Sequence, residues 1–266
     1  MQRIQVGNVE MVALSDCEAT YPASSVYPGA GSEQLAPYSR HMTADGGLTM
    51  NFGCYLLRAD GATVLVDAGY GPEQDGRLMR ELADAGVARD EIGIVIFTHL
   101  HGDHTGWNID RERGEPNFPN ARYLVPRKDW DHYRAQNPPS RSFARDIVPL
   151  ETLGKLELIE PEHRLTDSLL AVPSPGHTPG HLSVAIDSGG QRGMVIGDVV
   201  ISPVDVEEPD LDISFDWDHA IARQTRRAML DRLGDGTALV AASHLPAPGL
   251  GRFVPLEGKR TWRAIG

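Results

Sequence analysis

Three histidines and one aspartate fall within six consecutive residues of this chain. The apolar, β-branched run that precedes them predicts a buried strand that ends at the cluster. In an extended chain His99 and His101 project to the same side, because side chains alternate between the two faces. Gly102 then interrupts the strand, so that Asp103 and His104 can be aimed at a second point. One strand end can therefore supply ligands to two neighbouring metal ions.

Three further groups suited to a divalent metal lie where other predicted strands end. His177 stands in the turn Pro173–His181, Asp198 follows a short apolar run, and His244 follows the last buried strand. Sites in layered α/β folds form where strand ends open into crevices. Imidazole and carboxylate ligands without cysteine favour Zn²⁺, with Mn²⁺, Co²⁺ and Fe²⁺ as alternatives.

Two more polar residues each have two interpretations. Asp67 closes a predicted strand, and it either orients a ligand histidine through the far ring nitrogen or is an ordinary turn residue. His181 either hydrogen-bonds beside the ligands or satisfies the backbone of its loop, and we expect a structural role. The other histidines have no motif around them and are interpreted as surface or core residues: His41, His132, His163 and His219.

The composition narrows the class of protein and of partner. Apolar residues make up 41% of the 266 positions and charged residues 23%, which is typical of a globular protein and fits one domain over residues 1–266. A formal net charge of −12 argues against a nucleic-acid partner. The arginine-rich pieces Arg111–Arg113 and Arg223–Arg227 are interpreted as solvated faces. We expect a small-molecule substrate, no membrane contact, and a homodimer as the candidate assembly.

The cysteines and the N-terminal segment bear on the compartment. Cys17 and Cys54 have no ligand spacing, and we expect free, buried thiols. The segment Met1–Val6 lacks the apolar region of a signal peptide, and no apolar run approaches the ~18 residues of a membrane span. These features predict a cytoplasmic protein.

The alternation of apolar residues predicts an α/β fold with two mixed sheets and helices packed outside them. The predicted strands are a pair around Gly7–Asn8, then 49–58, 63–67, 92–97, 121–126, 156–159, 169–172, 182–186, 194–196 and 238–242, and a terminal hairpin over 251–265. The predicted helices are 76–86, 130–136 and 219–233. Residues 108–120 are a predicted polar insertion.

Residues 20–48 are rich in Pro, Gly, Ser and Ala without a clear period, which predicts a long loop. The loop is either a lid that walls a pocket or a disordered flap. Its candidate pocket-lining residues are Tyr21, Tyr27, Tyr38 and Met42. Trp130 and Tyr133 are expected in ordinary core packing rather than in a pocket wall.

The chain resembles the metallo-β-lactamase superfamily in the order of its seven candidate ligands: His99, His101, Asp103, His104, His177, Asp198 and His244. The resemblance covers essentially the whole chain. It implies the four-layer αβ/βα sandwich, with the site at the edges of the sheets.

The same resemblance implies two divalent metal ions. One would be held by His99, His101 and His177, and the other by Asp103, His104 and His244. Asp198 would bridge the two ions. On this basis the candidate catalytic residues are Asp103 and Asp198.

Within the superfamily, the closest similarity is to the methyl parathion hydrolase and lactonase branch, through segments 105–108, 175–181 and 243–251. The acyl-homoserine lactonases of this branch place a tyrosine three residues after the bridging aspartate, where this chain has Ile201. Without that tyrosine, polarisation by the metals is the main device that stabilises an oxyanion. The substitution therefore favours substrates with a good leaving group, such as an aryl ester or a phenolic lactone.

The resulting hypothesis is a dinuclear metal-dependent hydrolase. Hydroxide activated by the metals would attack a lactone, an aryl ester or a phosphotriester, and Asp198 would pass a proton to the leaving group. One alternative is a hydrolase with the same ligands that acts on a β-lactam, a thioester or a phosphodiester. The other alternative is a metal-binding redox or sensor module without hydrolytic activity.

Overall fold

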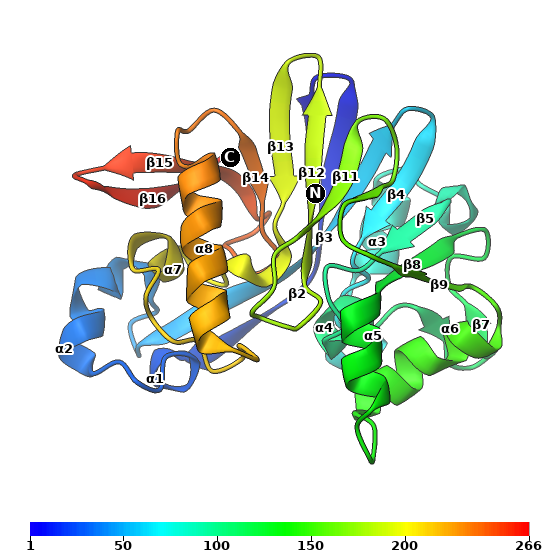
Figure 1. The fold of residues 1–266 in the computed structure, drawn as a ribbon, viewed down its shortest axis with the longest axis horizontal. Coiled ribbons are helices and arrows are strands. Elements are labelled where there is room, and N and C mark those ends of the chain that lie inside the picture. The colour runs from blue at the N-terminus through cyan, green and yellow to red at the C-terminus, as the bar shows by residue number, and fades with distance from the viewer. Residues whose placement is uncertain (266) are drawn as a thin grey trace.

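The computed structural model describes residues 1–265 and contains two seven-stranded sheets packed against each other (Figure 1). The first sheet has the order β1 (Gln2–Val6), β2 (Val9–Pro22), β3 (Gly47–Ala59), β4 (Ala62–Val66), β5 (Ile94–Ile96), β8 (Arg122–Pro126) and β9 (Leu156–Ile159). The second sheet has the order β10 (His163–Arg164), β11 (Leu169–Pro173), β12 (Leu182–Ser188), β13 (Gln191–Val195), β14 (Leu239–Ala241), β15 (Leu250–Leu256) and β16 (Lys259–Ala264). A small hairpin joins β6 (Ile109–Asp110) to β7 (Glu115–Pro116).

Both sheets are mixed, as the sequence predicts. Strands β4, β5, β8 and β9 are mutually parallel in the first sheet, and β13 is parallel to β14 in the second. The remaining pairs within the two sheets are antiparallel. The carboxyl ends of parallel strands meet at one edge of a sheet, which is where sites form in such folds.

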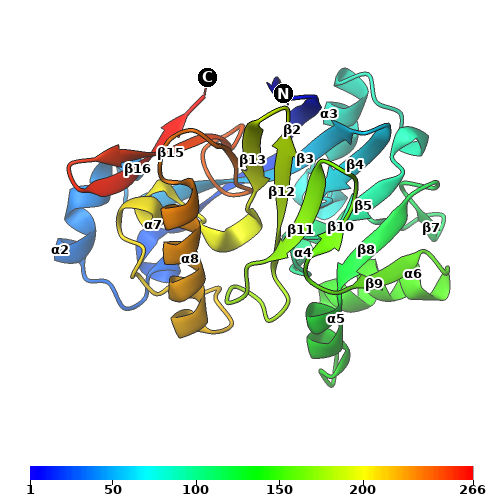
Figure 2. The ribbon, with the colours of Figure 1, turned by 45° about the horizontal axis from the view of Figure 1, so that its top comes forward.

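Helices cover the outer faces of the two sheets (Figure 2). The α-helices are α1 (Ala23–Val26), α2 (Ser32–Leu35), α3 (Leu78–Asp84), α4 (Gly102–Thr105), α5 (Arg127–Arg134), α6 (Val148–Thr152), α7 (Pro203–Glu207) and α8 (His219–Leu233). Short 3₁₀ segments cover Ala36–His41, Pro72–Gln74, Arg89–Glu91 and Gly197–Val199, and Phe143–Ile147 forms a π-turn.

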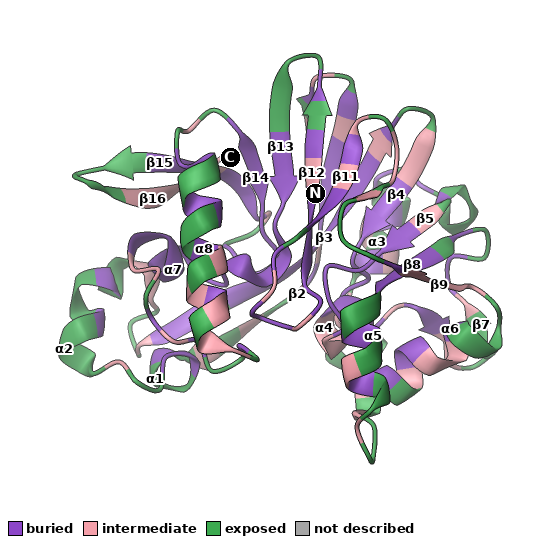
Figure 3. Cartoon of the chain, in the orientation of Figure 1, coloured by how far each residue is buried: buried purple, intermediate pink, exposed green. Residues whose placement is uncertain are grey.

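The apolar core lies in layers between these elements. Met11 and Leu57 of the first sheet pack with Val184 and Leu239 of the second, and all four are buried. Further buried clusters lie between the first sheet and α3 and α5, and between the second sheet and α8. Burial of each large apolar side chain contributes about 1.5–3 kcal/mol, so this arrangement fixes the sheets relative to each other. Figure 3 shows the purple, buried residues concentrated in the strands.

Helix α8 shows how the sequence specifies one outer layer. Its N-cap residue Asp218 accepts a hydrogen bond from the backbone N–H of Ile221, 3.0 Å away. Met229, Leu230 and Leu233 recur at helical spacing and are buried against the second sheet. The helix predicted over residues 219–233 is therefore confirmed at both ends.

The prediction of one long loop over residues 20–48 is wrong. Strand β2 continues to Pro22, β3 begins at Gly47, and short helices occupy most of the segment between them. An apolar cluster holds this segment in place, because Val26, Tyr27 and Leu35 pack with residues that follow Asp198 in the chain. The sequence shows no helical period in this segment because each helix is only one or two turns long.

Two other expectations need correction. Cys54 is a buried free thiol as expected, whereas Cys17 is only partly buried. Tyr27 and Tyr38 lie in the apolar cluster instead of lining a pocket near the histidines. Trp130 and Tyr133 pack in the core as expected.

No helix within residues 1–265 combines the length and apolar character needed to cross a bilayer.

Candidate metal centre

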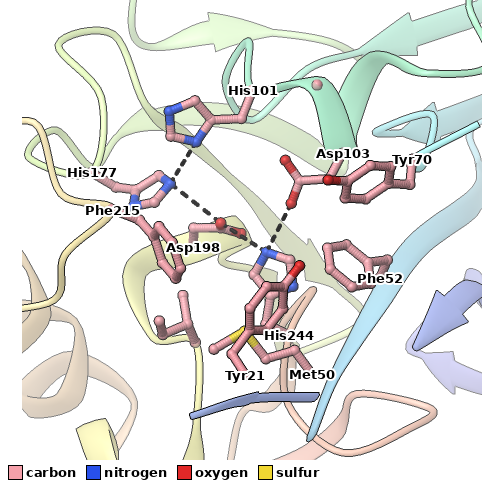
Figure 4. A pocket seen from close by; sticks show the side chains of 12 residues that line it. Tyr21, Met50, Phe52, Tyr70, His101, Asp103, His177, Asp198, Phe215 and His244 are labelled. Atoms are coloured by element: carbon pink, nitrogen blue, oxygen red, sulfur yellow. Dashed lines mark hydrogen bonds and ion pairs between the residues drawn. The ribbon is translucent and has the colours of Figure 1, made fainter. Parts of the chain in front are cut away.

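The seven candidate ligands converge at one edge of the two sheets. His99 follows β5, His177 follows β11, Asp198 follows β13, and His244 follows β14. Each strand is short and has buried apolar residues near its end, so the chain emerges from the core with a polar side chain. Figure 4 shows five of the seven side chains directed toward one another: His101, Asp103, His177, Asp198 and His244.

Three imidazoles form the first cluster. His101 Nδ1 lies 3.0 Å from His99 Nε2 and 3.0 Å from His177 Nε2. His99 is fully buried and His177 is 4% exposed. The alternation argument is confirmed here, because His99 and His101 direct their rings to the same point.

Two carboxylates and two imidazoles form the second cluster. His244 Nε2 lies 2.9 Å from Asp198 Oδ2 and 3.4 Å from Asp103 Oδ2. His104 Nε2 lies 3.4 Å from Asp198 Oδ1 and 3.5 Å from Asp103 Oδ2. Helix α4 begins at Gly102, so the chain turns at the predicted position and presents Asp103 and His104 on this side.

Asp198 lies between the two clusters. Its Oδ2 atom is 3.3 Å from His177 Nε2 and 3.8 Å from His99 Nε2, in addition to its contacts in the second cluster. One carboxylate therefore faces ligand atoms of both groups. This placement supports the bridging role that the resemblance implies.

The donor sets fit two divalent cations. Within each cluster, one ligand atom from every member lies within 4.8 Å of the others. His104 Nε2 and Asp198 Oδ1 are buried and have no hydrogen-bond partner in residues 1–265. A buried polar atom without a partner is costly, and a cation between these atoms would satisfy both. Imidazole and carboxylate ligands suit Zn²⁺, although their chemistry does not identify the metal.

The far ring nitrogens of four histidines are held by neighbouring groups. His104 Nδ1 lies 2.8 Å from Asp67 Oδ2, and His177 Nδ1 lies 3.0 Å from Asp216 Oδ1. His244 Nδ1 lies 2.8 Å from the backbone oxygen of Asn51, to which it can donate its proton. His99 Nδ1 lies 3.0 Å from the hydroxyl of Thr98. These partners fix the ring orientations and leave Nε2 of each ring available to a metal.

Asp67 contacts the far ring nitrogen of the candidate ligand His104, as the first of its two interpretations predicts. It is 1% exposed, and besides His104 it accepts hydrogen bonds from the backbone N–H and hydroxyl of Thr98 at 2.7 and 2.8 Å. Its φ of 63° lies in the left-handed region, which a non-glycine residue adopts at a cost. The turn and the orienting role therefore belong to the same residue.

Asp216 and Arg226 form a second orienting pair that the sequence analysis did not identify. Arg226 was interpreted as part of a solvated face, which is wrong, because the side chain is 1% exposed. Its guanidinium donates to Asp216 Oδ2 at 3.0 Å and to the backbone oxygens of Val199, Pro209 and Leu211 at 2.9–3.0 Å. Arg226 lies on the apolar face of α8. A charged residue at that position was the sequence feature that could have indicated its buried role.

Two buried residues connect the ligand-bearing turns. Asp129 accepts hydrogen bonds from the backbone N–H groups of Leu100 and Gly180 at 3.2 and 2.6 Å. His181 Nε2 accepts from the backbone N–H of Asp198 at 3.1 Å, and its Nδ1 lies 2.8 Å from the hydroxyl of Ser174. His181 thus has the expected structural role and also fixes the position of a ligand. The sequence did not single out Asp129, because it is one of many acidic residues and no motif surrounds it.

The two clusters differ in their electrostatics. Burial lowers the pKa of His101 to about 3, and the adjacent His177 adds to this effect. Burial opposes the charge on His244, but the carboxylates of Asp198 and Asp103 raise its pKa to about 10. Burial likewise opposes ionisation of Asp198, but the surrounding histidines, His244 foremost, hold its pKa well below the usual value. The second cluster therefore retains ionised carboxylates at neutral pH, which favours a cation.

A cavity of about 310 Å³ opens above the two clusters. Its polar lining side chains are His101, Asp103, His177, Asp198 and His244. Its apolar and aromatic lining side chains are Tyr21, Met50, Phe52, Tyr70, Ile201 and Phe215. Of the four candidate lining residues in segment 20–48, only Tyr21 lies in this cavity, and Met42 borders a separate one. The volume and apolar walls suit a small organic molecule.

A family model described as the metallo-beta-lactamase superfamily matches residues 54–244, which is more than half of the chain. The chain belongs to this superfamily. The matched residues include all seven candidate ligands of the two clusters. Membership in the metallo-beta-lactamase superfamily also agrees with the two packed sheets and their outer helices.

Curated relatives of this superfamily member include lactonases and metallo-hydrolases. An N-acyl homoserine lactonase from Bacillus sp is 26% identical over 158 residues, which cover 51% of this chain and 58% of that protein. A probable metallo-hydrolase from Bacillus subtilis (strain 168), YflN, is 27% identical over 210 residues, which cover 68% and 70%. The chain therefore matches only a little over half the length of the lactonase.

Solved structures of this superfamily are similar over nearly the whole chain. A dizinc quorum-quenching lactonase, AidC, in complex with the product N-hexnoyl-L-homoserine is 25% identical, with a TM-score of 0.87 and coverage of 100% of this chain and 97% of that one. The hydrolase AbOPH is 24% identical, with a TM-score of 0.87 and coverage of 99% and 97%, and this likeness concerns the fold.

Proposed function

We propose that the protein is a dinuclear metal-dependent hydrolase whose substrates are lactones. The observation that carries the proposal is the convergence of five imidazoles and two carboxylates below a cavity of about 310 Å³. The similarity to the N-acyl homoserine lactonase and to the dizinc lactonase AidC supports a lactone as the substrate class. Zn²⁺ is the metal we propose, because the ligands are imidazole and carboxylate groups.

The proposed residues of the first metal site are His99, His101 and His177. Those of the second site are Asp103, His104 and His244, with Asp198 shared. Divalent cations at such sites supply Lewis acidity, which lowers the pKa of water and polarises an acyl oxygen. The orienting partners Asp67 and Asp216 keep the ligand rings in place.

Asp198 has a second proposed role in the reaction. Its carboxylate lines the cavity between the clusters and faces ligand atoms of both. From this position it would accept the proton of the attacking water and pass it to the leaving oxygen. Asp103 is close to His104 and His244, and we propose that it helps to hold the attacking group in position.

The aromatic cavity walls favour a second candidate class. Phe52, Tyr70 and Phe215 would contact the ring of an aryl ester or an aryl phosphotriester. The ligand set does not distinguish these substrates from lactones, because each presents an electrophilic centre beside a polarisable oxygen. Lactones, aryl esters and aryl phosphotriesters are therefore distinguished by the relative rates at which the protein hydrolyses them.

A substrate panel on the metal-loaded protein tests the proposed function. We expect hydrolysis of an N-acyl homoserine lactone and of dihydrocoumarin, with a lower rate on an aryl phosphotriester. Dialysis against a chelator should abolish turnover, and addition of Zn²⁺ should restore it. The absence of metal-dependent hydrolysis on all three substrates would exclude the proposed function.

Two further expectations remain part of the proposal. The core shared by the two sheets supports a single domain over residues 1–266. The size of the cavity supports a small-molecule partner. The homodimer stays a prediction.

A further inference from the structure

Two tyrosine hydroxyls in the cavity have no assigned role. Tyr21 lies at the end of β2, and Tyr70 lies in the turn that follows β4. In Figure 4 both hydroxyls point toward the side of the cavity that contains Asp103 and His244. Neither hydroxyl has a hydrogen-bond partner within residues 1–265. By contrast, four other tyrosine hydroxyls bond to protein groups: those of Tyr27, Tyr38, Tyr55 and Tyr123.

Tyr70 is held rigidly relative to the second cluster. Its backbone N–H donates to Asp16 Oδ2 at 2.8 Å, and Asp16 is fully buried. Its ring packs edge to face on Phe52 at 5.0 Å, and Phe52 packs edge to face on His244 at 5.0 Å. The phenol is therefore fixed on the same support as a proposed metal ligand.

Tyr21 approaches the same region from the rim. Its ring packs edge to face on Phe215 at a centroid distance of 6.3 Å. The two hydroxyls and the Asp103 carboxylate lie in one region of the cavity (Figure 4). Burial, and after it the nearby Asp103 carboxylate, raises the pKa of both phenols, so both remain protonated at neutral pH and can donate.

Among the described residues, the cavity lining contains no hydroxyl other than these two phenols. Asp103 and Asp198 are ionised and accept hydrogen bonds. The lining imidazoles each direct one ring nitrogen into a cluster, and His177 and His244 hold the other nitrogen against Asp216 and the backbone oxygen of Asn51. Among the remaining lining side chains of the described residues, Met50, Phe52 and Ile201 are apolar. The two phenols are thus the hydroxyl donors that face an incoming substrate.

We propose that Tyr70 and Tyr21 donate hydrogen bonds to the acyl oxygen of the substrate and thereby allow hydrolysis of lactones with unactivated alkyl leaving groups. This inference rests on the proposed hydrolytic function. It differs from the expectation, drawn from Ile201, that substrates with a good leaving group are favoured. The hydroxyls come from other segments of the chain.

The reaction itself needs no transfer of a phenolic proton. The oxygen of water forms a bond to the acyl carbon, the ring C–O bond breaks, and one proton of the water reaches the leaving alkoxide. Negative charge builds up on the acyl oxygen before the ring opens. Donors aimed at this oxygen therefore lower the barrier, and the effect is largest when the alkoxide leaves reluctantly.

The first test compares an alkyl lactone with an aryl lactone. We expect Tyr70→Phe and Tyr21→Phe each to lower kcat/KM for N-hexanoyl homoserine lactone roughly tenfold, and the double variant roughly a hundredfold. The loss on dihydrocoumarin should stay below about threefold, because its phenolate leaves easily. Tyr38→Phe is the matched control, because its hydroxyl bonds to Glu208 outside the cavity, and it should retain full activity. Metal content is measured for every variant.

The second test is binding without turnover. Calorimetry would measure the affinity of metal-loaded protein for the γ-lactam that carries the same hexanoylamide group. We expect the Kd to rise roughly tenfold in each single variant and not in Tyr38→Phe. Equal losses on the two lactones, an unchanged Kd in the double variant, or no binding by the wild type would overturn the assignment of the phenols. A lactam affinity that depends on both phenols, in a protein that hydrolyses nothing, would overturn only the proposed function.

Discussion

Arg226 connects parts of the metal centre that are far apart in sequence. Its side chain donates to Asp216, which holds His177, and to the backbone oxygen of Val199, the neighbour of Asp198. A buried arginine is stable only when its donors are satisfied, and here four hydrogen bonds achieve this. The residue thus positions a ligand of each cluster without touching a substrate.

Substitution of Asp216, which accepts a hydrogen bond from Arg226 and lies against His177, should weaken metal binding. In Asp216→Asn, an amide nitrogen that can only donate replaces one of the two carboxylate oxygens. One of the two contacts is then lost, and we expect His177 to be held less firmly. We expect metal affinity to fall roughly 10–100-fold, measured by competition with a chromogenic chelator. Asp210→Asn is the control, because Asp210 pairs with Arg227 at the surface. Equal affinities of the two variants would contradict the orienting role.

His181 should make the metal-free protein sensitive to acid. Burial lowers its pKa to about 3, and its Nε2 accepts the backbone N–H of Asp198 only while that nitrogen is unprotonated. Between about pH 6.5 and about pH 3 the unfolded chain binds a proton that the folded chain does not. As the pH is lowered through this range, the free energy of unfolding should therefore decrease, by up to about 1.4 kcal/mol per pH unit from this residue.

The variant His181→Gln isolates this contribution. Its side-chain oxygen can accept the same hydrogen bond and does not titrate. Urea unfolding across the range should give a shallower dependence on pH for the variant than for the wild type, with chelator present throughout. Parallel curves would show that His181 titrates normally.

At the scale of elements, the N-terminal segment is attached to the loop that follows Asp198. The Tyr27 hydroxyl beside α1 donates to Asp205 of α7 at 2.6 Å. Asp205 also accepts the backbone N–H groups of Ile201 and Ser202 at 2.7 and 2.9 Å. The position of Ile201 in the cavity wall therefore depends on a residue that is remote in sequence.

Removal of this hydroxyl should destabilise the fold. In Tyr27→Phe the buried Asp205 carboxylate loses one donor, and we expect a loss of about 1–3 kcal/mol in the free energy of unfolding, measured in urea. Tyr38→Phe loses a hydroxyl whose partners Glu208 and Lys259 are partly exposed to water, so it should change stability by about 0.5 kcal/mol or less. A loss in Tyr27→Phe no larger than in this control would remove the proposed anchor.

The elements differ in how far the sequence predicts them. Strands such as β5 and β14 are apolar runs that end at a polar ligand, and their positions follow from the pattern alone. Helices α1 and α2 were missed because a single turn shows no period and tertiary contacts stabilise it. Asp129 was missed for a related reason, because its partners are backbone groups that only the folded chain brings together.

At the scale of the whole molecule, both sheets contribute to each cluster. The first sheet ends in His99, His101, Asp103 and His104, and the second supplies the other three ligands. An unfolded chain cannot reproduce this geometry, so bound metal stabilises the native state by mass action.

Metal removal should accordingly lower the Tm. At a metal concentration about a hundredfold above Kd, binding adds roughly 2.7 kcal/mol to the free energy of unfolding. Calorimetric scans of the Zn²⁺-loaded and chelator-treated protein should therefore give a Tm that rises with metal concentration. His244→Asn should reduce the shift, because it lacks one proposed ligand. Identical scans with and without metal would contradict the centre.

The cavity walls and the ligand-bearing turns come from different segments of the chain. Met50 and Phe215 shape the walls, but neither of them takes part in either cluster. Selectivity and reactivity are consequently separable in this scaffold. Exchange of these two side chains can retune which molecules enter, while the hydrolytic machinery beneath stays intact, so these wall positions are the natural place to engineer new preferences.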